Sequence, residues 1–354
     1  ELVAYDVALK GQYIEVDQRD DLIPLIVRVL YGRFMGKTQT GGKTMKENGL
    51  NRRAAILAFL VKMEPKELEY FLALVIQSIL PADLLMPQAI TYSKEHTGLD
   101  NREYAESKIG NITGKMRDWC SIIENVVSNL DAKSVNSVSW NRQLGFLQVQ
   151  AQLVKVLGLS ISGYLGSLLS LTFALLANAT EVRTDSLDAE VEAEAAVATE
   201  VEEDRLKASK PDADADDDED GDEDVEEEDE AVTVAALTRK DAVTSVRVRT
   251  TCLQVMADMV HNYHAEHDFA PIANAAFDLM GPLLESLPSS ISGAKRPPVL
   301  LKFISSLLQY PETVQIVTKR ENIVRTVIAC VASRAEDQAM HMVMLSLSLL
   351  VEQE

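Results

Sequence analysis

Apolar residues recur every three or four positions along most of this chain, and this spacing constrains the fold more than any other feature. One such stripe runs from Ile112 to Leu130, and comparable stripes occur in both halves of the sequence. Each stripe forms one face of an amphipathic helix. The pattern predicts helices at roughly 21–35, 50–64, 66–80, 111–130, 139–157, 160–178, 241–265, 269–287, 298–310, 320–334 and 336–352.

The connections between these helices are short, and several have proline at a helix start or boundary, as at Pro65, Pro271 and Pro311. Alternating strand patterns are nearly absent, although the Val- and Thr-rich stretch 231–250 is ambiguous between helix and strand. The predicted fold class is therefore all-α. Helices of this kind form either a closed bundle or a solenoid.

A weak internal repeat favours the solenoid. Residues 53–57 resemble residues 249–253, and residues 141–147 are similar with one extra residue. In each, a basic residue is expected near the start of a helix, with small or apolar residues after it, which resembles the helix starts of HEAT repeats. We therefore expect a HEAT- or armadillo-like α-solenoid of paired antiparallel helices.

Acidic residues concentrate in one segment. Residues 181–230 contain 25 acids and four bases, a net charge of −21 that equals the net charge of the whole 354-residue chain. Low hydrophobicity and high like charge cannot bury enough surface to offset the entropy cost of ordering. The sequence therefore predicts two helical segments, 1–180 and 238–354, that belong to one solenoid and flank a largely disordered acidic insertion, 181–237.

The charge distribution and the cysteines exclude several protein classes. Outside the acidic segment the chain is neutral, so it is neither a uniformly basic nucleic-acid-binding domain nor a uniformly acidic protein. Cys120, Cys252 and Cys330 are far apart and odd in number, which argues against a disulfide framework and for a reducing compartment. The first residues lack an initiator methionine and a signal pattern, as expected of a piece of a longer chain.

The stretch 156–180 contains no charged residue and is long enough to span a bilayer. Its serine, glycine and asparagine residues dilute the hydrophobicity, however, and a helix that is apolar on nearly every side is also what the interior of a solenoid requires. We expect a buried helix here and no membrane span.

One short region is strongly basic. Residues 28–53 carry seven basic side chains and a single acid, Glu47. Such a cluster on a helix–loop–helix corner can neutralise phosphates, and backbone amides of the glycine-rich loop 36–44 can assist. The alternative is a solvated loop that bonds only its own neighbours. This basic patch, a candidate contact for RNA or an acidic partner, consists of Arg28, Arg33, Lys37, Lys43, Lys46, Arg52 and Arg53.

Other motifs give no convincing chemistry. The loop 36–44 has lysine where a phosphate-binding loop needs its first glycine, and the acidic segment matches a calcium-loop spacing only because nearly every residue there is acidic. His261, His264 and His267 lack the carboxylate pattern of a metalloenzyme and are expected to form a polar helix end. We expect no catalytic residue, metal site or cofactor. A candidate contact for basic partners consists of Asp216, Asp217, Asp218, Glu219 and Asp220.

Three stretches resemble one known family. They are residues 22–35 with their Leu-Tyr-Gly-Arg sequence, residues 51–60 with Arg-Arg-Ala-Ala, and residues 140–147, Trp-Asn-Arg-Gln-Leu-Gly-Phe-Leu. Together they resemble the DRIM (down-regulated in metastasis) family, very large HEAT-repeat proteins associated with the U3 small nucleolar RNA. The resemblance continues more loosely to the region around Leu308 and leaves out the acidic insertion.

The resemblance implies a nucleolar, non-enzymatic scaffold in early small-subunit ribosome biogenesis, needed for processing of pre-ribosomal RNA within the small-subunit processome. It implies other processome proteins as partners, with pre-ribosomal or small nucleolar RNA as a further candidate partner. An alternative is a nuclear-transport receptor or another HEAT-repeat adaptor that binds basic cargo through an acidic surface. Trp119 and Trp140 do not recur along successive helices as that alternative requires. An enzyme hidden in the helical body would need a pocket that one sequence cannot reveal.

Overall fold

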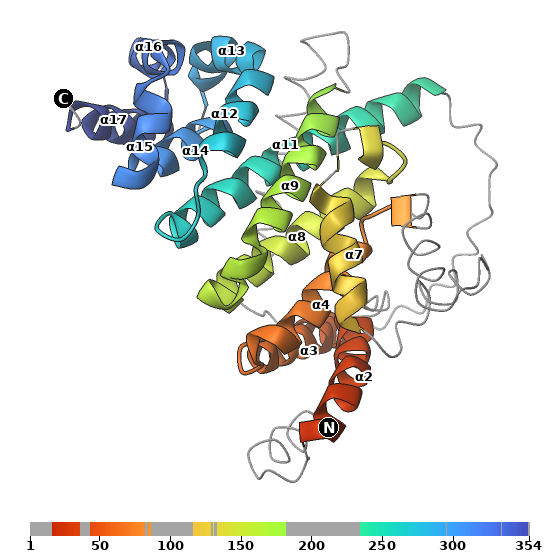
Figure 1. Ribbon diagram of the computed structural model, residues 1–354. Helices are drawn as coiled ribbons and strands as arrows, with labels where there is room; N and C mark the ends of the chain where they lie inside the picture. The colour runs from red at the N-terminus through yellow and green to blue at the C-terminus, as the bar shows by residue number, and fades with distance from the viewer. Residues whose placement is uncertain are drawn as a thin grey trace.

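The protein is built from helices packed on their neighbours (Figure 1). A computed structural model describes residues 16–35, 43–81, 84–85, 116–128, 130, 133–181, 234–294, 296–333 and 335–352. Within these ranges every regular element is an α- or 3₁₀-helix and no strand occurs, so the predicted all-α class is confirmed. The elements are α2 (Val16–Met35), α3 (Lys43–Leu60), α4 (Pro65–Gln77), α7 (Met116–Ser128), η1 (Lys133–Val135), α8 (Trp140–Leu157), η2 (Gly158–Tyr164), α9 (Leu165–Glu181), α11 (Val234–Tyr263), α12 (Ala270–Leu279), α13 (Gly281–Ile291), α14 (Val299–Leu308), α15 (Pro311–Thr318), α16 (Glu321–Cys330) and α17 (Asp337–Val351).

The C-terminal half repeats its packing. Helix α11 packs on α14, α12 on α15, α13 on α16, and α14 on α17, so each helix contacts the one three elements later. Helix α12 begins at Ala270 and α15 at Pro311, 41 residues later; for α13 and α16 the interval is 40 residues, and for α14 and α17 it is 38. HEAT and armadillo repeats have about 40–47 residues. The arrangement is that of an α-solenoid, as the sequence predicted.

Two element predictions need correction, and one ambiguity is resolved. The single helix expected over 269–287 is two helices, because Met280 leaves the helical conformation and α13 begins at Gly281, with Pro282 in its first turn. Helix α15 was missed, because its eight residues are too few for an apolar stripe to recur. The ambiguous stretch 231–250 is helical from Val234 onward, because the packing of α11 against α8 and α9 outweighs the strand propensity of its valines and threonines.

The expected basic helix start is also partly wrong. Arg142 does lie in the first turn of α8, but Arg53 and Arg249 lie well inside α3 and α11. Helix α3 begins with polar turns that carry no apolar stripe, and in α11 the polar residues 238–241 interrupt the stripe after the first turn, so periodicity places both starts too late. The 40-residue repeat is visible in the packing of the helices rather than in these short sequence matches.

Helix α9 lies at the centre of the structure. It packs on α7, α8, α11 and α12, and Figure 1 shows it beside α8 and α11. The side chains from Ala174 to Ala179 are all buried, as are Leu168, Leu169 and Leu171. A helix that neighbours cover on several sides exposes little surface to water, so its sequence needs no polar face. The prediction that the uncharged stretch forms a buried helix is therefore confirmed.

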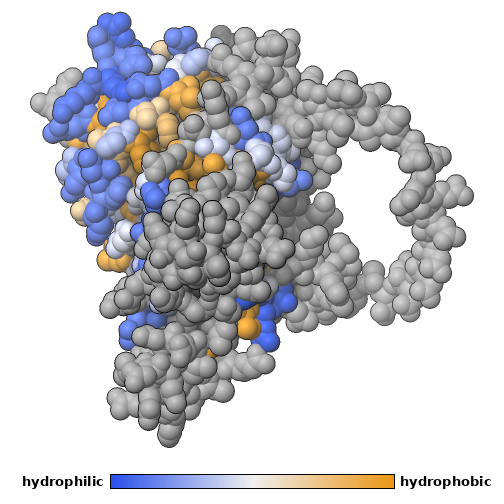
Figure 2. Space-filling model, turned by 45° about the vertical axis from the view of Figure 1, so that its right-hand side comes forward, coloured by the Kyte–Doolittle hydropathy of each residue, from blue (hydrophilic) through white to orange (hydrophobic). Residues whose placement is uncertain are grey.

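By length and hydropathy one segment of the described chain, Trp140–Thr180, could cross a membrane, and half of its most apolar window is buried inside the structure. The segment is not one straight helix, because η2 separates α8 from α9. In Figure 2 hydrophobic residues appear as separate patches between hydrophilic ones. Contacts with neighbouring helices thus account for much of the apolar surface of this segment.

Helix α11 joins the two halves of the chain. It follows the acidic segment in sequence yet packs along both α8 and α9, which precede that segment. The Tyr263 hydroxyl donates a hydrogen bond to the carbonyl of Gly158 at 2.7 Å, across 105 residues. The division into segments 1–180, 181–237 and 238–354 stays a prediction, because residues 182–233 lie outside the described ranges.

We predict opposite effects of alanine at two glycines. Gly158, at the turn after α8, has a φ of 51°, where a side chain is strained, so Gly158→Ala should lower the free energy of unfolding by about 1–3 kcal/mol. Gly32 lies in α2 and a Cβ there meets nothing within 4 Å, so Gly32→Ala should raise it by about 0.5–1 kcal/mol. Urea unfolding followed by circular dichroism measures both. Equal effects of the two substitutions would contradict this account of the turn.

Candidate functional site

The described part of the basic patch lies on two packed helices. Arg28 and Arg33 are on α2, and Arg52 and Arg53 are on α3, which packs against α2. Arg28, Arg33 and Arg52 each already interact within the protein. Lys43 and Lys46 belong to α3, rather than to the predicted loop, but their side chains are outside the described part, as are Lys37 and the acids Asp216, Asp217, Asp218, Glu219 and Asp220.

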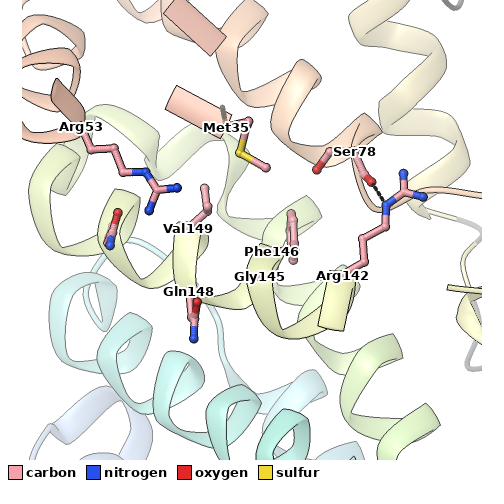
Figure 3. Close-up of a pocket in the computed structure, with 9 residues that line it drawn as sticks. Met35, Arg53, Ser78, Arg142, Gly145, Phe146, Gln148 and Val149 are labelled. Atoms are coloured by element: carbon pink, nitrogen blue, oxygen red, sulfur yellow. Dashed lines mark hydrogen bonds between the residues drawn. The ribbon is translucent and has the colours of Figure 1, made fainter. Parts of the chain in front are cut away.

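A pocket of about 260 Å³ opens beside Arg53, between the ends of α2 and α4, helix α3, and the outer face of α8. We call it the two-arginine pocket. Figure 3 shows Arg53 and Arg142 flanking it, with Met35 on one side and Phe146 and Val149 on the other. The nine lining residues are Met35, Arg53, Ser78, Arg142, Gly145, Phe146, Gln148, Val149 and Gln152.

Each arginine is held by a carbonyl at the C-terminal end of a helix. The Arg53 Nε donates to the carbonyl of Phe34, in the last turn of α2, at 3.1 Å, and its guanidinium lies 5.9 Å from the centre of the Phe34 ring. The Arg142 Nε donates to the carbonyl of Ser78, the residue that caps α4. Carbonyls at helix C-termini have no partner within the helix, and the helix dipole there favours cations. These two contacts, each between different helices, therefore fix both guanidinium groups in place.

The pocket keeps an excess of positive charge. Only the Nε of each arginine is used, and the Nη nitrogens of Arg53 and Arg142 have no hydrogen-bond partner among the described residues. No lining residue is acidic. The two helix ends supply about −0.5 charge each, which leaves about +1 from the two guanidinium groups. Such a site attracts anions and repels metal cations.

Helix α8 contributes to this charge balance. Its 18 residues include Arg142 and Lys155 and no acid. Beside the pocket, burial raises the pKa of Tyr31, although its hydrogen bond with Ser78 and the charge of Arg142 oppose the rise. The Tyr31 phenol therefore stays neutral at physiological pH and adds no negative charge. Arg142 was missed as a site residue because it is 89 positions from Arg53, although the absence of acids from its helix was visible in the sequence.

The histidines of the sequence motif pack against a neighbouring repeat. The ring of His264 stacks on that of Tyr310 at 3.6 Å with an interplanar angle of 11°, and its Nδ1 lies 3.3 Å from a carboxylate oxygen of Glu312. His261 hydrogen-bonds the Tyr310 hydroxyl, and the ring of His267 meets that of Phe269 edge-on. No group of three metal-ligating side chains occurs in the described part of the chain. These contacts connect the end of α11 to the start of α15.

The three cysteines are buried and free. Burial raises the pKa of the Cys120 and Cys252 thiols well above the usual range, and that of Cys330 to about 11. A thiol acts as a nucleophile only as the thiolate, so these groups are unreactive at neutral pH. The two-arginine pocket, by contrast, offers unused hydrogen-bond donors to a ligand.

The whole chain matches one protein family. A family model described as "U3 small nucleolar RNA-associated protein 20, N-terminal" matches residues 1–354. The chain belongs to this family. No solved structure matches the chain. The family match confirms the resemblance to the DRIM family, which was based on residues 22–35, 51–60 and 140–147.

Membership of this family places the chain in ribosome biogenesis associated with the U3 small nucleolar ribonucleoprotein. It implies association with processome proteins and the U3 RNA, and a nucleolar or nuclear location. The family is not a known class of enzyme. The match favours the processome interpretation of the sequence over the nuclear-transport alternative.

We predict that Arg142 stabilises the fold through its contact with α4. Arg142→Ala removes the donor to the Ser78 carbonyl and should lower the free energy of unfolding by about 1 kcal/mol. Lys155→Ala, on the same helix and with an exposed side chain, should change it by less than about 0.5 kcal/mol. Chemical unfolding of both variants checks the prediction. A loss for Lys155→Ala as large as that for Arg142→Ala would contradict it.

Proposed function

We propose that the chain is a structural scaffold for pre-ribosomal RNA processing in the small-subunit processome, and that it holds protein and RNA partners on its solenoid surface. The observation that carries the proposal is the family match over residues 1–354. The solenoid supports it, because stacked repeats form a long surface that can keep several partners at fixed separations.

The mechanism is passive and geometric. Helices α8, α9 and α11 form a buried core, so surfaces on either side of it are held in fixed positions. Binding to a rigid surface loses less conformational entropy than binding to a surface that must first order. A scaffold of this kind accelerates assembly by bringing partners together and needs no catalytic group of its own.

Two charged regions are the proposed contacts. On the basic side, Arg28, Arg33, Arg52 and Arg53, together with Lys37, Lys43 and Lys46, contact RNA phosphates or acidic partners through charge. On the acidic side, the run Asp216–Asp220 attracts basic protein tails. Attraction that rests on exposed charge weakens as salt rises, because the Debye length falls to about 3 Å at 1 M.

Purification of the tagged full-length parent protein from cells tests the proposal. We predict that the U3 RNA and other processome proteins copurify, and that ultraviolet crosslinking recovers RNA on peptides from α2 and α3. An unrelated HEAT-repeat protein with the same tag is the control and should recover neither. Recovery of transport factors and basic cargo without pre-ribosomal RNA would contradict the proposal.

A further inference from the structure

We propose that the two-arginine pocket binds the backbone of single-stranded RNA, with the free Nη groups of Arg53 and Arg142 on its phosphates. This inference rests on the RNA-binding part of the proposed function and assigns it to particular atoms. It also moves the centre of the site away from the basic patch on α2 and α3, because Arg142 belongs to α8.

The first argument is that the donors are unused and already oriented. Each guanidinium is fixed through its Nε to a backbone carbonyl, which leaves its outer edge with no partner among the described residues. A planar guanidinium donates two parallel hydrogen bonds to a phosphate. Since the side chains are already held, little rotamer entropy is lost when an anion binds.

The second argument is the composition of the pocket between the arginines. Phe146 and Val149 of α8 form an apolar floor, and Met35 faces them from the end of α2. Gln148 and Gln152 add amide groups that both donate and accept hydrogen bonds. A nucleotide presents a phosphate, an aromatic base face and polar base edges, and so matches all three. An acidic peptide side chain supplies only the charge. Single-stranded RNA is therefore favoured over an acidic peptide.

The third argument concerns the form of the RNA. In a duplex the base faces are stacked and the deep major groove is closed to side chains, so an apolar floor has nothing to contact. From Arg142 to Gln152, helix α8 spans about 15 Å at about 1.5 Å per residue. At about 3.4 Å per stacked nucleotide, that length corresponds to about four nucleotides. A short unpaired stretch is long enough to occupy the site.

Binding of a fluorescently labelled decauridylate to the 354-residue chain tests the inference. We expect Arg53→Gln and Arg142→Gln each to weaken binding about tenfold, since each removes charge-assisted hydrogen bonds. Each should also reduce the slope of log affinity against log salt by about 0.7, the value for one phosphate contact on a single strand. Lys155→Gln removes the same charge from α8 but does not line the pocket, so it should change affinity less than about twofold.

A second variant keeps both arginines and fills the space between them in the pocket. Gly145 lines the pocket, and a Cβ there meets nothing within 4 Å, so a side chain can start at this position without a clash. We expect the longer side chain of Gly145→Met to fill the pocket. This variant should weaken decauridylate binding at least fivefold with an unfolding midpoint that does not fall, because replacing a glycine inside a helix favours folding. Loss of binding with both arginines present separates occupancy of the pocket from loss of charge alone.

Two results would overturn the inference. One is unchanged affinity and salt slope in both glutamine variants; the other is a decaglutamate peptide that competes as well as unlabelled decauridylate, which would make the pocket a site for acidic proteins. A failure of this pocket assignment can be told apart from a failure of the proposed function. If the glutamine variants bind normally while the parent protein still copurifies with the U3 RNA, only the assignment to this pocket is wrong. If the chain does not bind decauridylate and the parent protein does not copurify with the U3 RNA, then the pocket assignment and the proposed function are both wrong.

Discussion

The burial of the uncharged helix α9 is the interaction on which the rest of the structure depends. A helix without a polar face is stable in water only when neighbours cover it, and α7, α8, α11 and α12 provide that cover. Two of these helices precede the acidic segment and two follow it. The hydrophobic effect therefore joins parts of the chain that are separated by an acidic segment of net charge −21, and one body results.

Helix α8 links this core to the candidate site. On its inner face, buried amides set the register against α9: the side chain of Gln150 donates to Thr172 at 2.8 Å, and that of Asn178 donates to Gln143 at 3.3 Å. An unmade hydrogen bond in such a place costs about 1–3 kcal/mol, so the pairing resists sliding of the helices. The outer face of the same helix then presents Arg142 and the apolar floor to α2, α3 and α4. The core thus determines where the pocket forms.

The sequence predicted the helices well and their ends less well. Apolar periodicity reports a buried face, so it located α9 and α14. It placed the starts of α3 and α11 too late, because α3 begins with polar turns and the polar residues 238–241 follow the first turn of α11. The basic patch was found because its charges are close in sequence. The pocket was not, because Arg53 and Arg142 meet only after α3 packs on α8. Contacts between residues far apart in sequence depend on packing, which a single sequence does not display.

Native-state hydrogen exchange tests most directly whether α8, α9 and α11 form one cooperative unit across the acidic segment. The chain is held at increasing subdenaturing urea concentrations, and exchange is read by mass spectrometry for peptides from each helix. If the account is right, these three helices open with the same free energy and the same dependence on urea, because none can remain buried without the others. Opening of α11 at a distinctly lower free energy, with α8 and α9 still protected, would contradict it. The two halves would then be independent units, and the scaffold would not hold its surfaces in fixed positions.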